Sequence, residues 1–392
     1  TSKEGDAMAD KTKKLIADTF LAIAEGLETG TFGAKPKIAV TAMGSEHGEE
    51  TVMEGAVKAA RAGADVYFIG TITHPEVTTV PVADEDEAHK KMEELLETGA
   101  VDGAVTMHYP FPIGVSTVGR AVTPGKGHEM FIANTTGTSS TDRIEGMIKN
   151  AIYGIIAAKA CGVADPTVGI LNVDGARQTE GALKTLKENG YPITFAESAR
   201  ADGGCVMRGN DVLMGSADVM VTDSLTGNIL SKMLSSACTG GSYEAVGYGY
   251  GPGIGKGYDR LVMIISRASG APVIAGAINY AAQLVRGKVF EVAAAEFAAA
   301  EKAGLEKLLA ERKVAANKSA APAEDVVAPP KEIVTAQIPG IEVMDLEDAV
   351  KALWKEKIYA EDGMGCTGPI VRVSEANKDR AVEILKAAGF VS

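Results

Sequence analysis

Short apolar runs alternate with longer amphipathic stretches along most of the chain. Apolar runs bounded by turn residues predict strands at Ile38–Ala42, Asp65–Ile69, Gly103–Met107, Thr167–Val173, Ile193–Glu197, Asp218–Thr222, Leu261–Ile265 and Pro272–Ala275. Apolar positions at helical spacing predict helices at Lys11–Gly26, Glu49–Ala62, Asp84–Thr98, Thr141–Cys161, Asn228–Ser236 and from Ile278 to about Arg312. Strands divided by helices form βαβ units, so we expect an α/β fold with a largely parallel sheet.

The pattern changes after residue 312. Residues 313–332 are rich in alanine, proline and charge and hold almost no large apolar side chains, which predicts a flexible linker. Beyond it, helices at Asp345–Lys355 and Glu375–Ala388 and a strand at Ile370–Val373 predict a small α/β domain. We therefore expect a large α/β domain over residues 1–312, a linker over 313–332, and a small, mobile C-terminal domain over 333–392.

Composition narrows the class of protein. The 392 residues carry a net charge of −13, which disfavours nucleic acid and anionic membrane surfaces as main partners. No run reaches the roughly 18 apolar residues of a membrane span, and the charged N-terminus lacks the apolar core of a signal peptide. The four cysteines are far apart, without a C-x-x-C pair, so neither a zinc site nor a disulfide framework is indicated. We expect a cytoplasmic protein with reduced thiols and no metal.

The first candidate motif is the loop Ala42–Gly48 (AMGSEHG), between a predicted strand and a predicted helix. Ligands of open parallel sheets bind beyond the carboxyl ends of the strands, and a helix N-terminus there offers free N–H groups to an anion. Gly44, Ser45 and His47 are therefore candidate phosphate- or acyl-binding residues. The alternative is a plain turn in which Ser45 or Glu46 caps the helix.

The second motif runs from a strand into Asp223-Ser224-Leu225-Thr226-Gly227-Asn228 and on into a helix. Asp223 is a candidate for orienting a substrate group. Thr226 and Asn228 are candidate side-chain donors, and Gly227 a candidate exposed amide. The alternative, at least equally supported, is that Asp223 or Thr226 simply caps the helix.

The third motif is the glycine run Gly247–Tyr258, followed by a strand that ends in Ser266-Arg267-Ala268-Ser269. Neither a Walker sequence nor a Rossmann fingerprint is present. Glycine runs can form flexible lids. Ser266 and Arg267 after a strand are typical of an anion clamp, because arginine contacts phosphate or carboxylate in a planar, bidentate way.

The chain resembles the phosphate acyltransferases of phospholipid synthesis, which make acyl phosphates. The resemblance lies in four motifs that occur in the same order: AMGSEHG, Val168–Asn172 (VGILN), ADVMVTDSLTGN and YGYGPGIGKG. The segment at Ser266 is similar to one in phosphate acetyl- and butyryltransferases. The resemblance covers roughly residues 35–288. It implies a two-lobed parallel-sheet fold related to isocitrate and isopropylmalate dehydrogenases, with inorganic phosphate as substrate and no bound cofactor.

The C-terminal extension, which carries Cys366, distinguishes this chain from those simple transferases. Cys366 lies between glycines in Asp362–Pro369 (DGMGCTGP), just before a predicted strand. Small neighbours leave a sulfur accessible, and backbone N–H groups stabilise a thiolate. Cys161, by contrast, reads as a small core residue, and Cys205 and Cys238 are intermediate cases.

With its C-terminal extension, nearly the whole chain resembles the smaller (alpha) subunit of component C of glycine/sarcosine/betaine reductase complexes. The resemblance implies that Cys366 carries an acetyl group as a thioester. The acetyl group is derived from a carboxymethyl group on selenoprotein A, and phosphate cleaves the thioester to acetyl phosphate. It also implies a component C beta (larger) subunit as partner, and we expect an oligomer.

Three other functions fit parts of the sequence. A free-standing phosphate acyltransferase using coenzyme A or carrier-protein thioesters leaves Cys366 without a role. A non-catalytic scaffold would only dock the larger subunit. The third is a metal- and NAD-dependent decarboxylating dehydrogenase. It is disfavoured because the motif loops of this sequence lack the clustered aspartates that would bind the metal. The favoured mechanism is transfer from a Cys366 thioester to phosphate held near Ser266, Arg267 and the Thr226–Asn228 turn.

Overall fold

A computed structural model describes residues 34–199, 203–319, 326–341, 345–365 and 368–391, with isolated helical positions between residues 13 and 26. The predicted opening helix at 11–26 therefore lies almost wholly outside the described residues. Cys366 and Thr367 lie outside them as well.

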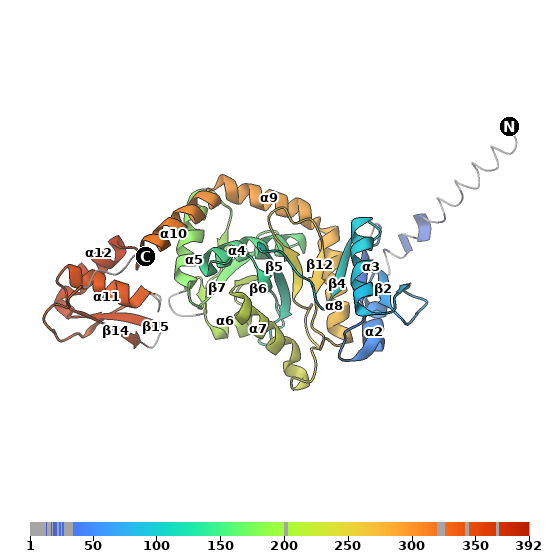
Figure 1. Cartoon of the computed structure of the whole chain (residues 1–392), viewed down its shortest axis with the longest axis horizontal. Helices are drawn as coiled ribbons and strands as arrows, with labels where there is room; N and C mark the ends of the chain where they lie inside the picture. Colours follow the sequence, from blue (N-terminus) through green and yellow to red (C-terminus); the bar gives the residue numbers. More distant parts are fainter. Residues whose placement is uncertain are drawn as a thin grey trace.

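The chain builds one large, mostly parallel sheet with helices on both faces (Figure 1). Its order is β3-β2-β1-β4-β12-β11-β5-β6-β10-β7-β8, and β9 also pairs with β7. The strands are β1 Lys37–Thr41, β2 Asp65–Gly70, β3 Thr78–Pro81, β4 Gly103–Thr106, β5 Val115–Val122, β6 Glu129–Thr138, β7 Thr167–Leu171, β8 Thr194–Phe195, β9 Val206–Met207, β10 Val219–Val221, β11 Gly251–Ile254 and β12 Val262–Ile264. The predicted α/β class and parallel sheet are confirmed.

Alternate side chains of each strand enter different cores. In β1, Ile38 and Val40 join the large core, whereas Ala39 joins a smaller core on the other face. The covering helices are α2 Gly48–Arg61, α3 Glu85–Glu97, α4 Arg143–Ala160, α5 Ala176–Glu188, α6 Gly209–Met214, α7 Ser224–Ser236, α8 Ala271–Arg286, α9 Val289–Lys302 and α10 Leu305–Ser319, with a short 3-10 turn, η1 Ala237–Thr239. Burial on both faces explains why most strands read as continuous apolar runs.

Strand direction reverses in the middle of the sheet. β1, β2, β3, β4 and β12 are mutually parallel, and so are β6, β10, β7, β8 and β9. Between these two groups the pairs β12–β11, β11–β5 and β5–β6 are all antiparallel. The carboxyl ends of the two parallel groups therefore open at opposite edges of the sheet.

The middle of the glycine run, Gly251–Ile254, is a buried central strand, β11, rather than part of a lid. Gly251 has a φ of 84°, and a Cβ there would lie 1.7 Å from the Val118 carbonyl oxygen. A Cβ on Gly253 would lie 2.3 Å from the Phe111 ring. The glycines thus allow β11 to fit against its neighbours, a need that composition alone does not distinguish from flexibility.

Two predicted elements after β12 are wrong. Pro272–Ala275 is not a strand but the first turns of α8, where Pro272 occupies an early helical position that needs no N–H donor. The single long helix predicted to about Arg312 is three helices. They are divided at Lys288, whose φ is 54°, and at Gly304, whose φ is 88°. Several elements were not predicted, notably β5, β6, α5 and β11, because small and polar residues interrupt their apolar patterns.

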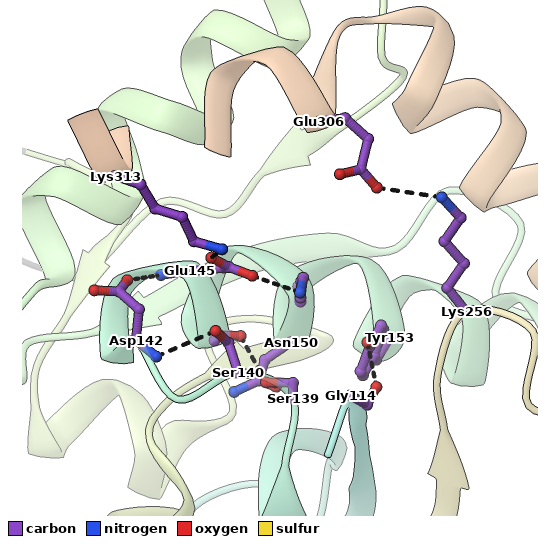
Figure 2. A network of polar contacts seen from close by, with 12 residues as sticks. Gly114, Ser139, Ser140, Asp142, Glu145, Asn150, Tyr153, Lys256, Glu306 and Lys313 are labelled. Carbon is purple, nitrogen blue, oxygen red and sulfur yellow. Dashed lines mark hydrogen bonds and ion pairs between the residues drawn. The ribbon is translucent and has the colours of Figure 1, made fainter. Parts of the chain in front are cut away.

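Two ion pairs connect helix α10 to other parts of the chain (Figure 2). Near the start of α10, Glu306 lies 3.2 Å from Lys256, and in the middle of the helix Lys313 lies 2.9 Å from Glu145, in the first turn of α4. The helix continues to Ser319, past the expected domain boundary at residue 312. Alanines in this stretch favour helix as much as they favour a linker. Residues 320–325 lie outside the described part.

The C-terminal residues form a separate sheet in the order β13-β15-β14. Its strands are β13 Ala336–Pro339, β14 Ala360–Gly365 and β15 Gly368–Val373, accompanied by helices α11 Leu346–Lys355 and α12 Lys378–Ala387 and the turn η3 Glu375–Asn377. Ile338, Leu353, Val371 and Leu385 belong to its own apolar cluster. Gly365 pairs with Gly368 across the antiparallel β14–β15 ladder.

The start of α7 is fixed by two close contacts. Asp223 is the N-cap, and its carboxylate accepts hydrogen bonds from the Thr226 N–H at 3.0 Å and the Thr226 hydroxyl at 2.7 Å. Gly227 is buried, and a Cβ at this position would lie 1.7 Å from the Asn134 carbonyl oxygen. Helix α7 can therefore approach β6 only with glycine at 227.

Gly227→Ala should lower the free energy of unfolding by about 1–3 kcal/mol, because the added methyl overlaps backbone. Gly181→Ala is the matched control, since Gly181 is helical, exposed and without an atom within 4 Å of the added Cβ. It should be neutral or stabilising by up to about 1 kcal/mol. Urea unfolding monitored by circular dichroism measures both. Equal midpoints for the two variants would contradict the packing argument.

Asp223→Ala should lower the free energy of unfolding by about 1 kcal/mol at neutral pH, as loss of an N-cap does. Burial alone would raise the pKa of Asp223, but hydrogen bonds from Thr226 and the nearby Arg143 hold this pKa below its usual value. The stabilisation is thus present above the unfolded pKa, about 3.9, and disappears as pH falls through the lower folded pKa. Urea titrations at neutral and acid pH test this, and a gap that widens on acidification would refute it.

Candidate functional site

The predicted site residues fall into two groups at different edges of the sheet. The first loop cluster, residues 42–48, 243–245 and 265–272, gathers at the carboxyl ends of β1 and β12. The second loop cluster, residues 134–143, 172–175 and 222–228, gathers around the carboxyl ends of β6, β7 and β10. Gly44, Ser45, His47, Ser266 and Arg267 belong to the first loop cluster.

Arg267 joins the two main loops of the first loop cluster. Its Nη1 donates to the Gly44 carbonyl at 3.0 Å, and its Nη2 lies 2.7 Å from a Glu85 carboxylate oxygen. The Arg267 carbonyl also accepts a hydrogen bond from the Glu46 N–H at 2.9 Å. A guanidinium has five N–H donors, so these two contacts leave donors for an anion. The side chain is 45% exposed, which keeps it within reach of a ligand.

Gly44 permits this approach. Its φ is 90°, and a Cβ there would lie 2.4 Å from Arg267 Nη1. Ser45 Oγ accepts a hydrogen bond from the His47 N–H at 3.2 Å, which shapes the turn into α2. His47 is the N-cap of α2 but makes no side-chain capping bond, and its ring packs edge-on to Tyr243 at 5.9 Å. The alternative that Ser45 or Glu46 caps the helix is therefore not what the structure shows.

A cavity of about 460 Å³ opens beside these loops. His47, Thr51 and Lys58 line it from α2, and Tyr243, Gly270 and Ala271 line it from the other side. Helix α8 starts here without a side-chain cap, as α2 does. The uncapped start of a helix offers backbone N–H groups to an anion. The start of α8 has fewer of them, because Pro272 lacks an N–H and the Val273 N–H donates to the Gly270 carbonyl at 3.1 Å. A larger cavity, of about 620 Å³, lies between α5, α10 and the C-terminal segment, and no predicted residue lines it.

Ser266 sits in a tight turn behind Arg267. Its N–H donates to Ser269 Oγ, and its own hydroxyl accepts from the Ala268 N–H, both at 3.1 Å. Ser269 in turn lies 3.3 Å from the buried carboxylate of Glu244. The Ser266 hydroxyl is therefore engaged within the loop, and its first role is to shape the backbone that carries Arg267.

The second loop cluster is occupied by structural contacts. Arg143 Nη2 lies 3.0 Å from Asp223, which is already the N-cap of α7. Asn228 Nδ2 donates to the Thr135 carbonyl at 3.1 Å. Gly227 is packed against β6, so the expectation of an exposed amide at Gly227 is wrong. For Asp223 and Thr226 the capping alternative describes the structure.

The sheet separates the two clusters. Thr135, which Asn228 contacts, lies on β6, and Ser266 follows β12. β5 and β11 lie between these strands, so three strand spacings, about 14 Å, separate them. One phosphate cannot bridge that distance, and the predicted joint site of Ser266, Arg267 and the Thr226–Asn228 turn is not brought together.

Sequence reasoning missed Glu85, Arg143 and Glu244, which hold the predicted residues in place. Glu85 begins α3, and Glu244 precedes the glycine run in a stretch without apolar periodicity. The signal available for Glu244 was a lone carboxylate in a segment otherwise free of acid, since no other aspartate or glutamate occurs between Asp223 and Asp259. That signal does not reveal its partners.

The described cysteines differ in reactivity. Burial raises the pKa of Cys161 to about 12. Burial, followed by the nearby Glu180 carboxylate, raises the pKa of Cys205 to about 12 as well. Neither thiol is a thiolate at neutral pH, whereas Cys238 is exposed at the end of α7. Cys161 is therefore an unreactive thiol packed against the large core, as the sequence predicts.

The described residues contain neither a cluster of metal ligands nor a membrane-spanning helix. Among those residues, no three His, Cys, Asp or Glu side chains gather closely enough to hold a metal ion. Of the helices in the described ranges, none is long and apolar enough to cross a membrane.

Known proteins resemble the chain at several levels. The phosphate acyltransferase of Thermus thermophilus is 26% identical over 234 residues, which cover 50% of this chain and 70% of that protein. A branched-chain phosphotransacylase structure from Enterococcus faecalis V583 covers 63% of this chain and 99% of its own, at 18% identity and a TM-score of 0.45.

Two further matches extend over most of the chain. The model of the fatty acid synthesis protein family matches residues 36–372. The glycine/sarcosine/betaine reductase complex component C subunit alpha of Peptoclostridium acidaminophilum is 61% identical over 382 residues, covering 97% of this chain and 99% of that protein. The chain therefore belongs to the fatty acid synthesis protein family and, within it, to the alpha subunits of component C of glycine/sarcosine/betaine reductase complexes.

Proposed function

We propose that the chain is an acyltransferase subunit of a glycine reductase complex. It carries an acetyl group as a thioester on Cys366 and transfers that group to inorganic phosphate, giving acetyl phosphate. Selenoprotein A supplies the carboxymethyl group from which the acetyl group is made, and the component C beta subunit is the direct partner. No bound cofactor takes part in the transfer to phosphate.

One observation carries the phosphate half of the proposal. Arg267 links the Gly44–His47 loop to the Ser266–Gly270 loop, at an edge where two uncapped helix N-termini flank a cavity. A guanidinium with unused donors and nearby free amides suits an oxyanion with several acceptor oxygens. In the second loop cluster Asp223, Thr226 and Asn228 bond within the protein, and the Arg143 guanidinium lies between the carboxylates of Asp174 and Asp223.

The transfer step is a displacement at the thioester carbonyl. A phosphate oxygen bonds to the carbonyl carbon, the carbon–sulfur bond breaks, and the electron pair leaves on Cys366 as a thiolate. The proton of the attacking phosphate goes to solvent. Arg267 orients phosphate, and backbone N–H groups of the first loop cluster stabilise the negative charge that develops on the acetyl oxygen.

The domain organisation serves this step. We propose that residues 333–392 act as a carrier domain. It is joined through α10 and the segment after it to the domain that contains the large sheet, here called the sheet domain. The sheet domain has the two-lobed acyl-phosphate-transferase architecture. Tethering raises the local concentration of the thioester to the millimolar range, which favours transfer within the chain.

Arg267→Ala should raise the phosphate concentration that half-saturates acetyl phosphate formation by at least about tenfold, as expected for losing a charged hydrogen bond worth 1.5–3 kcal/mol. Arg260→Ala is the control, since Arg260 also pairs with carboxylates, Glu93 and Glu97, but outside the loops. Acetyl phosphate release from the assembled complex measures both variants. Unchanged phosphate dependence in Arg267→Ala would remove the first loop cluster as the phosphate site.

Cys366→Ser should fold normally and lose acetyl phosphate formation, because a serine alkoxide is far scarcer than a thiolate at neutral pH. Incubation of the full chain with acetyl phosphate, without free phosphate, should add one acetyl group at Cys366. Cys238→Ser is the control, because Cys238 is an exposed thiol of the described residues. Peptide mass spectrometry locates the adduct. An adduct on Cys238 or Cys205 with Cys366 unmodified would move the chemistry into the sheet domain.

A further inference from the structure

Glu244 is a buried carboxylate behind the loop that carries Arg267. The residue is only 4% exposed and lies between α7, the start of β11 and the Ser266–Gly270 loop. Its contacts reach all three of these segments.

The backbone of Glu244 pairs with the loop. Its N–H donates to the Ala268 carbonyl at 3.0 Å, and its carbonyl accepts from the Gly270 N–H at 2.8 Å. These bonds form an isolated parallel bridge between Glu244 and Ser269. The inner side of the loop is therefore fixed at Glu244, whereas Gly44 and Glu46 fix its outer side.

The side chain of Glu244 acts only as an acceptor. Oε1 accepts from the Tyr250 hydroxyl at 2.7 Å, and Oε2 accepts from Ser269 Oγ at 3.3 Å. Lys232 of α7 places its Nζ 3.7 Å from Oε1. An ionised carboxylate satisfies both hydroxyl groups at once, and the nearby lysine offsets part of the cost of burying its charge.

The hydrogen bond that Glu244 accepts from Ser269 determines the direction of the neighbouring hydrogen bond, between Ser269 and Ser266. Ser269 uses its proton toward Glu244, so its oxygen is free to accept from the Ser266 N–H at 3.1 Å. A group that donated to Ser269 would compete with that N–H for the same oxygen. The orientation of the Ser266 amide, and hence of the backbone that leads into Arg267, depends on Glu244 being an acceptor.

We propose that Glu244 is a positioning residue for phosphate use: through Ser269 and the loop backbone it holds Arg267 in the orientation that binds phosphate. The proposal rests on the proposed function, which assigns phosphate to the first loop cluster. Glu244 itself touches neither phosphate nor the thioester.

Glu244→Gln is the sharp test, because glutamine keeps the shape and replaces one acceptor oxygen by a donor. Glu296→Gln is its control. Glu296 is equally a buried carboxylate that accepts from a tyrosine hydroxyl, Tyr191 at 2.8 Å, and pairs with a lysine, Lys159, but it lies on α9. Both substitutions disturb a buried Tyr–Glu–Lys group, and only one disturbs the loop.

The full chain is first acetylated with acetyl phosphate and freed of small molecules. Inorganic phosphate is then added at increasing concentration, and the release of acetyl phosphate is followed in a single turnover. Glu244→Gln should raise the half-saturating phosphate concentration by about tenfold, the effect of one misdirected hydrogen bond near a charge. Glu296→Gln should stay within about twofold of the parent, even where its unfolding midpoint falls.

Ser269→Ala removes the relay without touching Glu244, and it should raise the half-saturating concentration as well. If Glu244→Gln does not fold, the phosphate dependence of Ser269→Ala tests the positioning role on its own. A rise of equal size in Glu296→Gln, or no rise in Glu244→Gln and Ser269→Ala, would overturn the positioning role. Arg267→Ala separates the two proposals. If it leaves the phosphate dependence unchanged, the phosphate site is wrong; if it alone raises the half-saturating concentration, only the role of Glu244 is wrong.

Discussion

Strand β11 lies between β12 and β5 with backbone so close to backbone that a side chain cannot stand at Gly251. Because β11 and β5 both run antiparallel to their neighbours, the direction of the sheet reverses across them. The two groups of carboxyl ends then open at opposite edges. The position of each loop cluster, and the length of sheet that separates them, depends on this tightly packed centre.

The segment that leads into β11 also supports polar groups. Tyr250 donates to Glu244, which holds the first loop cluster, while Tyr248 bonds Glu129 and lies 4.4 Å below the guanidinium of Arg120. The alternation of tyrosine and glycine thus places each ring beside a carboxylate and leaves room for the neighbouring backbone. Close packing and the polar supports of the site come from one short sequence.

Most of the parallel sheet follows from apolar periodicity, and the first loop cluster follows from where its strands end. β1, α2, β2 and α4 lie where the pattern predicts them because their burial is regular. The reversal at β11 was not predictable, since glycine spacing does not reveal what backbone will lie opposite. For the same reason Asp223 and Gly227 looked like ligand-binding residues, whereas a cap and a close approach account for them. Glu244 was not among the predicted site residues, because its contacts depend on tertiary structure that the sequence pattern does not reveal.

The two ion pairs of α10 differ in how much water surrounds them. Lys256 and Glu306 are 57% and 68% exposed, whereas in the other pair Lys313 is 63% exposed but its partner Glu145 is only 9% exposed. Dissolved salt screens exposed charges far more than sheltered ones. Rising ionic strength would therefore loosen the α9–α10 corner first and leave Lys313 attached to α4. The middle of α10 would then stay against the start of α4 across a wide range of salt.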